Sequence, residues 1–229
     1  MQSSTFWPPK SSSSPLAVLI SGGLDSAVLL AEAASVYPRV QPLYIRVGSV
    51  WEGIEEHYCR DFLGKLNRTN VSPLHVLEMP VTDLYGKHWS LTGEAVPDEK
   101  SPDEAVLLPG RNVILLSKAL IYCHLNGIPE VAMAPLEANP FPDATPEFFQ
   151  AMAQTVSMAV GGNLRILTPY SGLHKVDVVR RGQTYPLSLT FSCINPVGTK
   201  HCGRCNKCAE RQKGFQEANV PDPTEYHAL

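Results

Sequence analysis

The sequence has no surplus of positive charge and no long apolar run. Its 229 residues carry 19 Lys and Arg against 22 Asp and Glu, for a formal net charge of -3. This balance disfavours nucleic acid as a partner, because proteins that bind it usually present a basic face. The apolar run at residues 16–20 is far too short to cross a bilayer. The composition therefore predicts a protein without a membrane anchor.

The first fifteen residues lack the apolar stretch of a signal peptide. They contain serines, prolines and one lysine, which predicts a flexible tail over residues 1–15 and, by default, a cytoplasmic location. The length and the 44% content of hydrophobic residues fit one fold better than two domains.

Short apolar segments alternate along the chain with segments of helical periodicity. We expect strands at 16–20, 42–47, 73–79, 130–134 and 164–167, and helices at 25–36, 52–66, 112–126, 148–160 and 175–181. Thr145 and Pro146 form a typical helix start, with a capping hydroxyl before a proline at the first helical position. The alternation predicts an α/β fold with a doubly wound, mostly parallel sheet and ligands at the carboxyl ends of its strands.

A glycine-rich hexapeptide joins the first predicted strand to the first predicted helix. Its residues are Ser21, Gly22, Gly23, Leu24, Asp25 and Ser26. The glycines let the backbone turn sharply and bring its N–H groups close to an anion, and the helix N-terminus adds partial positive charge. The ending of a Walker A loop and the spacing of a dinucleotide fingerprint are both missing. We predict a phosphate-binding loop; the alternative is a turn whose Asp25 and Ser26 only cap the helix.

Four of the six cysteines crowd near the C-terminus. They are Cys193, Cys202, Cys205 and Cys208, spaced C-x8-C-x2-C-x2-C. Short C-x2-C steps let thiolates from one tight turn reach a single ion, which predicts a structural zinc knot. An iron–sulfur cluster is the open alternative, and disulfides fit poorly in a chain without a secretion signal. We interpret His201 as an exposed bystander and Arg211 as one of the residues that offset the thiolate charge.

Several motifs resemble those of a known family. The hexapeptide resembles the Ser-Gly-Gly-x-Asp-Ser signature of the PP-loop ATP pyrophosphatases. The cysteine segment is similar to the Ser-Cys and Cys-Gly-x-Cys-x-x-Cys signature of one family in that class, the 7-cyano-7-deazaguanine synthases of the queuosine pathway. Further segments shared with the family are Pro109-Gly110-Arg111-Asn112, Thr168-Pro169 with Lys175, and residues 222–226. The resemblance implies a fold like that of the adenine nucleotide alpha hydrolases, with the PP-loop domain at residues 16–189 and a zinc-binding segment at 190–229 packed on it.

The resemblance also implies an activity. Enzymes of this family activate the carboxylate of 7-carboxy-7-deazaguanine with ATP, convert it to an amide with ammonia, and dehydrate the amide to a nitrile with a second ATP. The hexapeptide would bind pyrophosphate and Mg²⁺, and Asp25, Arg111 and Lys175 would be catalytic, the last two by stabilising phosphate charge. The implied cofactors are ATP, Mg²⁺ and structural Zn²⁺, and the implied partners are a small carboxylate and ammonia.

Two segments at strand ends differ from the family pattern. Where the family has Tyr-Gly-Gln-Arg-His, residues 46–52 read Arg-Val-Gly-Ser-Val-Trp-Glu, and residues 141–148 lack the family's Cys-Arg pair. Because a substrate would sit at these ends, the candidate substrate residues are Arg46, Trp51, Glu137 and Asp143. Trp51 offers an aromatic face for stacking. Glu55 and Glu56, which open a predicted helix, are interpreted as acidic groups that complement its dipole.

Three functions stay open at this point. The first is the amide-forming or nitrile-forming ligase, and the second is a divergent PP-loop enzyme that acts on another carboxylate or on RNA. The third is a nucleotide-binding partner module that lost its chemistry along with the two altered segments. The lack of a basic surplus weakens the RNA version. A homodimer is expected because symmetric dimers are common for enzymes of this size.

Overall fold

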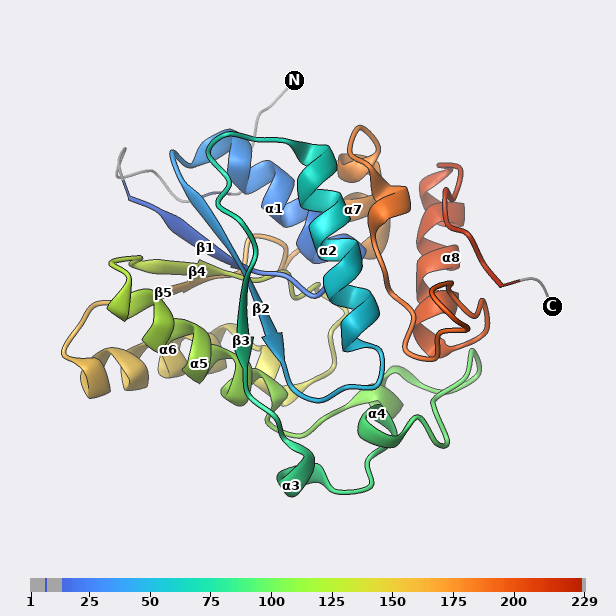
Figure 1. Cartoon of the computed structure of the whole chain (residues 1–229), viewed down its shortest axis with the longest axis horizontal. Helices are drawn as coiled ribbons and strands as arrows, with labels where there is room; N and C mark the ends of the chain where they lie inside the picture. The colour runs from blue at the N-terminus through green and yellow to red at the C-terminus, as the bar shows by residue number, and fades with distance from the viewer. Residues whose placement is uncertain (1–6, 8–13, 228–229) are drawn as a thin grey trace.

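A five-stranded sheet forms the centre of the computed structural model, which describes Trp7 and residues 14–227. All neighbouring strands run parallel, in the order β3-β2-β1-β4-β5 (Figure 1). The strands are β1 (Leu16–Leu19), β2 (Val40–Arg46), β3 (His75–Glu78), β4 (Glu130–Ala132) and β5 (Arg165–Leu167). The order reverses between β1 and β4, which is where such sheets bind ligands. The predicted doubly wound, parallel α/β fold is confirmed.

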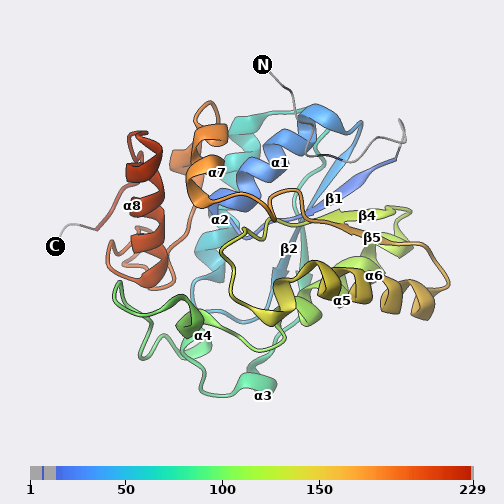
Figure 2. The same cartoon turned by 180° about the vertical axis from the view of Figure 1, so that it is seen from behind.

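Helices cover both faces of the sheet (Figures 1 and 2). One core contains residues of α1 (Leu24–Val36), α2 (Glu52–Leu66), α7 (Lys175–Gly182) and α8 (Asn206–Ala218), and the other contains residues of α5 (Arg111–Leu125) and α6 (Pro146–Val160). In β1, Leu16 and Val18 belong to the first core and Ala17 to the second. Successive strand residues point to opposite faces, so one short strand supports both cores.

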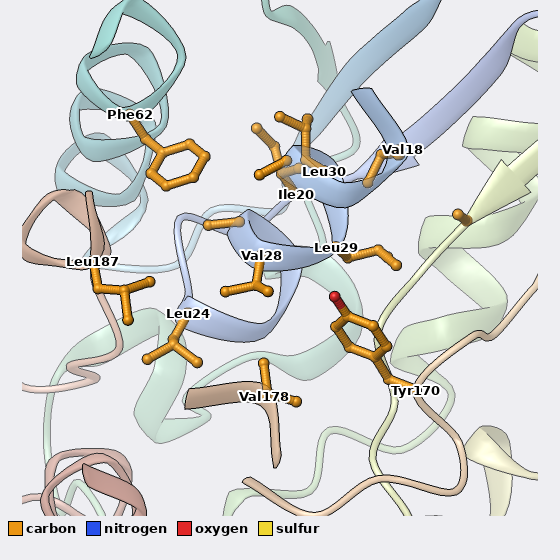
Figure 3. Packing of buried hydrophobic residues seen from close by; sticks show 14 of the residues in the cluster. Val18, Ile20, Leu24, Val28, Leu29, Leu30, Phe62, Tyr170, Val178 and Leu187 are labelled. Atoms are coloured by element: carbon orange, nitrogen blue, oxygen red, sulfur yellow. The ribbon is translucent and has the colours of Figure 1, made fainter. Parts of the chain in front are cut away.

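Helix α1 lies inside the first core. Residues 26–31 are all buried, which suits a sequence that is apolar on every side rather than along one stripe. Figure 3 shows Val28 surrounded by Phe62 of α2, Val178 of α7 and Tyr170. A Cβ on Gly182 would lie 2.6 Å from Val28 Cγ2, so the approach of α7 to α1 depends on this glycine. The close packing holds the first turn of α1 in place.

The predicted start of α6 is confirmed, since Thr145 Oγ1 accepts a hydrogen bond from Phe148 N–H at 3.2 Å. The Pro-rich stretch at residues 80–109 contains three short helical turns, and further 3-10 turns follow it. These are α3 (Thr82–Tyr85), α4 (Trp89–Thr92), η1 (Asp103–Val106), η2 (Pro142–Ala144) and η3 (Leu187–Leu189). The stretch is tied to the cysteine segment, because Glu99 N–H donates to Arg204 O at 3.0 Å and Asn206 N–H donates to Pro97 O at 3.1 Å.

The predicted N-terminal tail falls mostly on residues 1–6 and 8–13, which lie outside the described residues. Trp7 is buried and packs edge-to-face on Tyr37, with ring centroids 5.5 Å apart. This tryptophan therefore belongs to the core around α1. Within Trp7 and residues 14–227, no helix combines the length and the apolar character that crossing a membrane requires.

Candidate active site

A cleft opens at the carboxyl ends of β1 and β4, where the strand order reverses. It has two adjoining lobes of about 260 and 290 Å³. The first, the strand lobe, is lined by strand ends and the loop after β4, among them Leu19, Tyr44 and Met133. The second, the zinc-side lobe, is lined by Trp51, Trp89 and the start of α8. Residues shared by both lobes include Ser21, Gly23, Asp25, Glu55 and Arg111.

The predicted phosphate loop borders both lobes and leads into α1. The Ser26 hydroxyl accepts a hydrogen bond from Ser21 N–H at 3.2 Å and donates to Gly23 O at 3.1 Å, which closes a tight turn. Gly22 has a φ of 74°, and a Cβ there would lie 2.9 Å from Glu55 O. Gly23 is the N-cap of α1 and has no side chain to satisfy the first helical N–H groups. These donors, together with the positive helix end, suit a phosphate.

A chain of charged side chains runs from the phosphate loop to α8. Lys175 Nζ lies 2.5 Å from Asp25 Oδ2 and 2.8 Å from Glu210 Oε1. Lys207 Nζ lies 2.7 Å from Glu210 Oε2. Burial alone would lower the pKa of Lys175, but the carboxylates of Asp25 and Glu210 outweigh it and raise that pKa above its ordinary value. The lysine therefore stays charged beside the loop.

The same network of charges sets the pKa of Glu210 and leaves one carboxylate oxygen of Asp25 without a partner among the described residues. Burial would raise the pKa of Glu210, but Lys175 and Lys207 overcome it and lower the pKa to about 2. Asp25 Oδ1 is buried, and none of the described residues gives it a hydrogen bond. A buried oxygen of this kind usually meets a ligand or an ion, and a carboxylate oxygen is a ligand that Mg²⁺ prefers.

Arg111 begins α5 and lines both lobes. The Arg111 backbone N–H donates to Leu108 O at 3.1 Å. Its guanidinium has no hydrogen-bond or ion-pair partner in the described part of the chain, so this group is available to an anionic ligand. Asp143 lies next to it and holds the helix start, since its Oδ2 accepts from Asn112 N–H at 2.9 Å and its carbonyl accepts from Asn112 Nδ2 at 2.9 Å. Asp143 lines the strand lobe, and its carboxylate caps α5.

Arg46 and Glu137, two of the other predicted substrate residues, line neither lobe. Arg46 pairs with Glu56 and with Glu78, and Glu137 pairs with His174 at 3.2 Å. Both therefore engage protein partners outside the cleft.

Trp51 does reach the cleft, in the wall of the zinc-side lobe. Its ring stacks on Trp89 with centroids 5.5 Å apart and an interplanar angle of 17°. Only 5% of Trp51 is exposed, so the residue is packed as part of the wall and offers little surface to a ligand.

Glu55 is a cleft residue that the sequence interpretation assigned to the helix dipole. Its Oε2 accepts from the Tyr44 hydroxyl at 2.7 Å and its Oε1 accepts from Trp51 Nε1 at 3.0 Å. Burial raises the pKa of Glu55 to about 7, against the opposing effect of these two donors and of Arg111. The contact between Trp51 and Glu55 could have been found from the sequence, because side chains four residues apart lie on the same face of a helix.

The four C-terminal cysteines converge on one buried point. Their Sγ atoms all lie within 4.8 Å of one another, with Cys193 and Cys205 at 3.8 Å and Cys202 and Cys208 at 4.0 Å. A tetrahedral zinc ion with Zn–S distances of about 2.3 Å places its sulfurs about 3.8 Å apart. An iron–sulfur cluster distributes its thiolates over several irons and so holds them further apart. The geometry therefore fits a single zinc ion.

Backbone N–H groups surround two of the sulfurs. Those of Asn195 and Cys202 donate to Cys193 Sγ at 3.4 and 3.3 Å. Those of Arg204 and Cys205 donate to Cys202 Sγ at 3.5 and 3.3 Å. Such bonds stabilise the thiolate form that a metal ligand must take.

Two neighbours of the cysteines, His201 and Arg211, are buried and hydrogen-bonded. His201 is only 1% exposed and its Nε2 accepts from Ser192 N–H at 3.1 Å, so the interpretation as an exposed bystander is wrong. Burial and the charge of Arg211 lower the pKa of His201 to about 4. Arg211 is 2% exposed and donates to the hydroxyls of Thr190 and Thr224. The arginine thereby ties three parts of the C-terminal segment together.

Comparisons with known proteins identify the family of the chain. The model of the family described as "Queuosine biosynthesis protein QueC" matches residues 16–219. The 7-cyano-7-deazaguanine synthases of Myxococcus xanthus and Paracoccus denitrificans are 32% and 34% identical to the chain; the alignments cover 91% of this chain each and 96% and 91% of those proteins. A solved 4-thiouridine synthetase–RNA complex with bound ATP matches with a TM-score of 0.50 and 16% identity over 90% of this chain and 50% of that one, which supports the fold. The chain belongs to the QueC family of queuosine biosynthesis proteins.

Proposed function

We propose that this protein is an ATP-dependent ligase that converts 7-carboxy-7-deazaguanine to 7-cyano-7-deazaguanine in the cytoplasm. The substrate carboxylate attacks the α-phosphorus of ATP and displaces pyrophosphate, ammonia converts the resulting acyl adenylate to an amide, and a second ATP drives dehydration to the nitrile. The observation that carries the proposal is the phosphate loop at the strand reversal, with Lys175 and Arg111 beside it in one cleft.

Each cleft residue has a role in this proposal. The N–H groups at the start of α1 bind the pyrophosphate part of ATP, with the hydroxyls of Ser21 and Ser26 completing the loop. Lys175 and Arg111 stabilise the negative charge that develops as the bond to pyrophosphate breaks. Lys175 is already ionised and fixed by its carboxylate partners, so little reorganisation is needed during the reaction.

Two metal ions fit the residues present. Asp25 would hold Mg²⁺ through its unpartnered buried oxygen, and this ion would neutralise phosphate charge. The four thiolates would hold Zn²⁺ in a closed shell that leaves no position for substrate, so this ion is structural.

The test is pyrophosphate release from ATP and Mg²⁺ with 7-carboxy-7-deazaguanine and ammonium, with nitrile formation followed by mass spectrometry. Asp25→Asn should lower the rate by roughly 100-fold or more, because the change removes a charge from the metal and phosphate site. Asp61→Asn is the control, since Asp61 is an exposed residue of α2 that pairs with His57. The control should keep the wild-type rate.

Other outcomes favour the alternatives. Release with a different carboxylate would make the protein a divergent enzyme with another substrate, and release only with RNA would make it an RNA-modifying enzyme. ATP binding without release under any condition would favour a non-catalytic module. A homodimer is part of the proposal and would appear as a doubled mass in sedimentation.

A further inference from the structure

Glu55 differs in its partners from Asp25 and Glu210, two other carboxylates of the cleft. Asp25 pairs with Lys175, and Glu210 pairs with both Lys175 and Lys207. Glu55 has no Lys, Arg or His within ion-pair distance in the described part of the chain, and its two partners are the neutral donors of Tyr44 and Trp51. It is thus a carboxylate without a fixed counter-charge at the junction of the two lobes.

The position of this carboxylate is fixed. Tyr44 lies on β2 and is 3% exposed, and Trp51 is packed against Trp89, so neither donor is free to move. The backbone of Glu55 itself contacts the loop, where a Cβ on Gly22 would meet Glu55 O. Each carboxylate oxygen can accept a second hydrogen bond. The group is therefore held in place with acceptor capacity to spare.

The charged and titratable groups around Glu55 allow it to exchange a proton near neutral pH. Burial raises its pKa to about 7 and Glu52 of the same helix adds to that rise, while Arg111 of α5 and the donors Tyr44 and Trp51 oppose it. Glu55 in turn raises the pKa of the Cys59 thiol one turn further along α2, where burial has the larger effect. A base works best when its pKa lies near the operating pH.

We propose that Glu55 is the base that deprotonates ammonium in the cleft, a role that rests on the proposed function. At neutral pH, ammonia is mostly present as ammonium. Ammonium has no free lone pair on nitrogen and so cannot act as a nucleophile. The Glu55 carboxylate takes one proton from ammonium, the freed nitrogen lone pair forms the C–N bond with the carbonyl carbon, and the C–O bond to AMP breaks. AMP leaves with that electron pair, and the amide nitrogen gives its surplus proton to water.

Hydroxylamine distinguishes this role from a structural one, because hydroxylamine is already unprotonated at neutral pH. For Glu55→Gln we expect ATP–pyrophosphate exchange with the substrate acid to stay near the wild-type rate. Ammonium-dependent amide formation should fall by roughly 100-fold to 10,000-fold. Hydroxamate formation with hydroxylamine should stay within roughly fivefold of wild type.

The matched control is Glu56→Gln, the neighbouring carboxylate, which pairs with Arg46 and Arg60 outside the cleft. It should keep ammonium-dependent turnover within roughly threefold. An equal fall with ammonium and hydroxylamine in Glu55→Gln, or no fall with ammonium, would overturn the role of Glu55 while leaving adenylation intact. Absence of exchange in the wild type would overturn the proposed function, and this role with it.

A second variant tests the base through its pKa. Trp51→Phe removes the Nε1–H donor that favours the charged form of Glu55, so the pKa of Glu55 should rise. The acidic limb of the pH–rate profile with ammonium should then move to higher pH by roughly one unit. A lower rate at every pH with an unmoved limb would mean that Trp51 and Glu55 act only in packing, and would contradict the proposal.

Discussion

At the residue scale, Arg111 and Lys175 are two cations of one cleft with opposite surroundings. Lys175 is held by Asp25 and Glu210, whereas Arg111 has no such partner among the described residues. Arg111→Gln should therefore lower pyrophosphate release by roughly 100-fold to 1,000-fold and change the free energy of unfolding by less than about 0.5 kcal/mol. Release assays and urea unfolding of the same preparation give both numbers.

Lys175→Gln is the contrasting variant. It removes the cation that pairs with Asp25 and leaves Glu210 with Lys207 alone, so it should lower the free energy of unfolding by roughly 2–4 kcal/mol in addition to the loss of activity. If Arg111→Gln were destabilising to the same degree, Arg111 would have a structural role that its surroundings do not indicate.

Glu55→Gln is expected to stabilise the protein in alkaline solution. The pKa of Glu55 is about 7 in the folded state, above its ordinary value, so between the two values the folded state binds more protons than the unfolded state. Stability therefore falls as the pH rises through this window. Glu55→Gln does not have this pH-dependent loss of stability. Its free energy of unfolding should exceed that of wild type by roughly 1–3 kcal/mol at pH 8, and the two proteins should differ by only a few tenths of a kcal/mol at pH 4.5.

Urea unfolding at the two pH values measures this difference in the free energy of unfolding. For Glu56→Gln we expect a change of the opposite sign at pH 8. Burial of Glu56 opposes its charge, but Arg60 and Arg46 outweigh it and hold the pKa of that carboxyl below its ordinary value. Loss of this charge should destabilise the protein at pH 8. A Glu55→Gln variant that is less stable than wild type at pH 8 would contradict the burial cost assigned to this side chain.

At the element scale, α8 connects the cysteines to the phosphate loop. Cys205 is the N-cap of α8 and Cys208 lies in its first turn. Glu210, two residues after Cys208 in the same helix, forms an ion pair with Lys175. Phe191, just before the first cysteine, donates its N–H to Gly22 O at 2.6 Å. A metal ion held by the cysteines at one end of α8 would thereby be linked to the position of Lys175 beside the phosphate loop.

Removal of the metal should consequently unfold the start of α8. We expect about one zinc per chain by atomic absorption and a loss of helical circular dichroism with a strong chelator. ATP affinity should weaken in the same sample, because Glu210 no longer holds Lys175. Cys208→Ala should behave like the chelated protein, and Cys123→Ala, which changes a lone buried thiol of α5, should still bind zinc. Unchanged helix content without metal would contradict the link.

At the scale of the whole molecule, α8 near the C-terminus shares a core with α1 and α7. Phe215 and Ala218 of α8 belong to the same cluster as Val28 of α1 and Val178 of α7. The zinc-bound protein should therefore unfold in one cooperative transition, with equal calorimetric and van't Hoff enthalpies. Two separated transitions would mean that residues 190–229 form an independent unit.

Several features of this protein follow from short stretches of sequence. The strand, the Ser21–Ser26 loop and the helix that follows are adjacent in the chain, and the alternation of such units implies a parallel sheet with its ligand site at the strand ends. The C-x2-C steps bring thiolates together within a few residues. These parts are predictable because the groups that must meet are close in sequence. Helix α8 was not predicted, because its charged sequence shows no clear apolar stripe. The spacing of the cysteines at its start indicated a metal site rather than a helix.

Only the tertiary structure decided the direction of the polar side chains. Arg46 and Glu137 are at the expected strand ends, yet each meets a partner from another segment that holds it outside the cleft. From the sequence, Glu55 was expected only to complement the helix dipole. In the structure its carboxylate accepts a hydrogen bond from Tyr44 of β2 and lies at the junction of the two lobes. A side chain takes the direction in which its hydrogen bonds and charges are satisfied, and those partners come from residues far away in the chain.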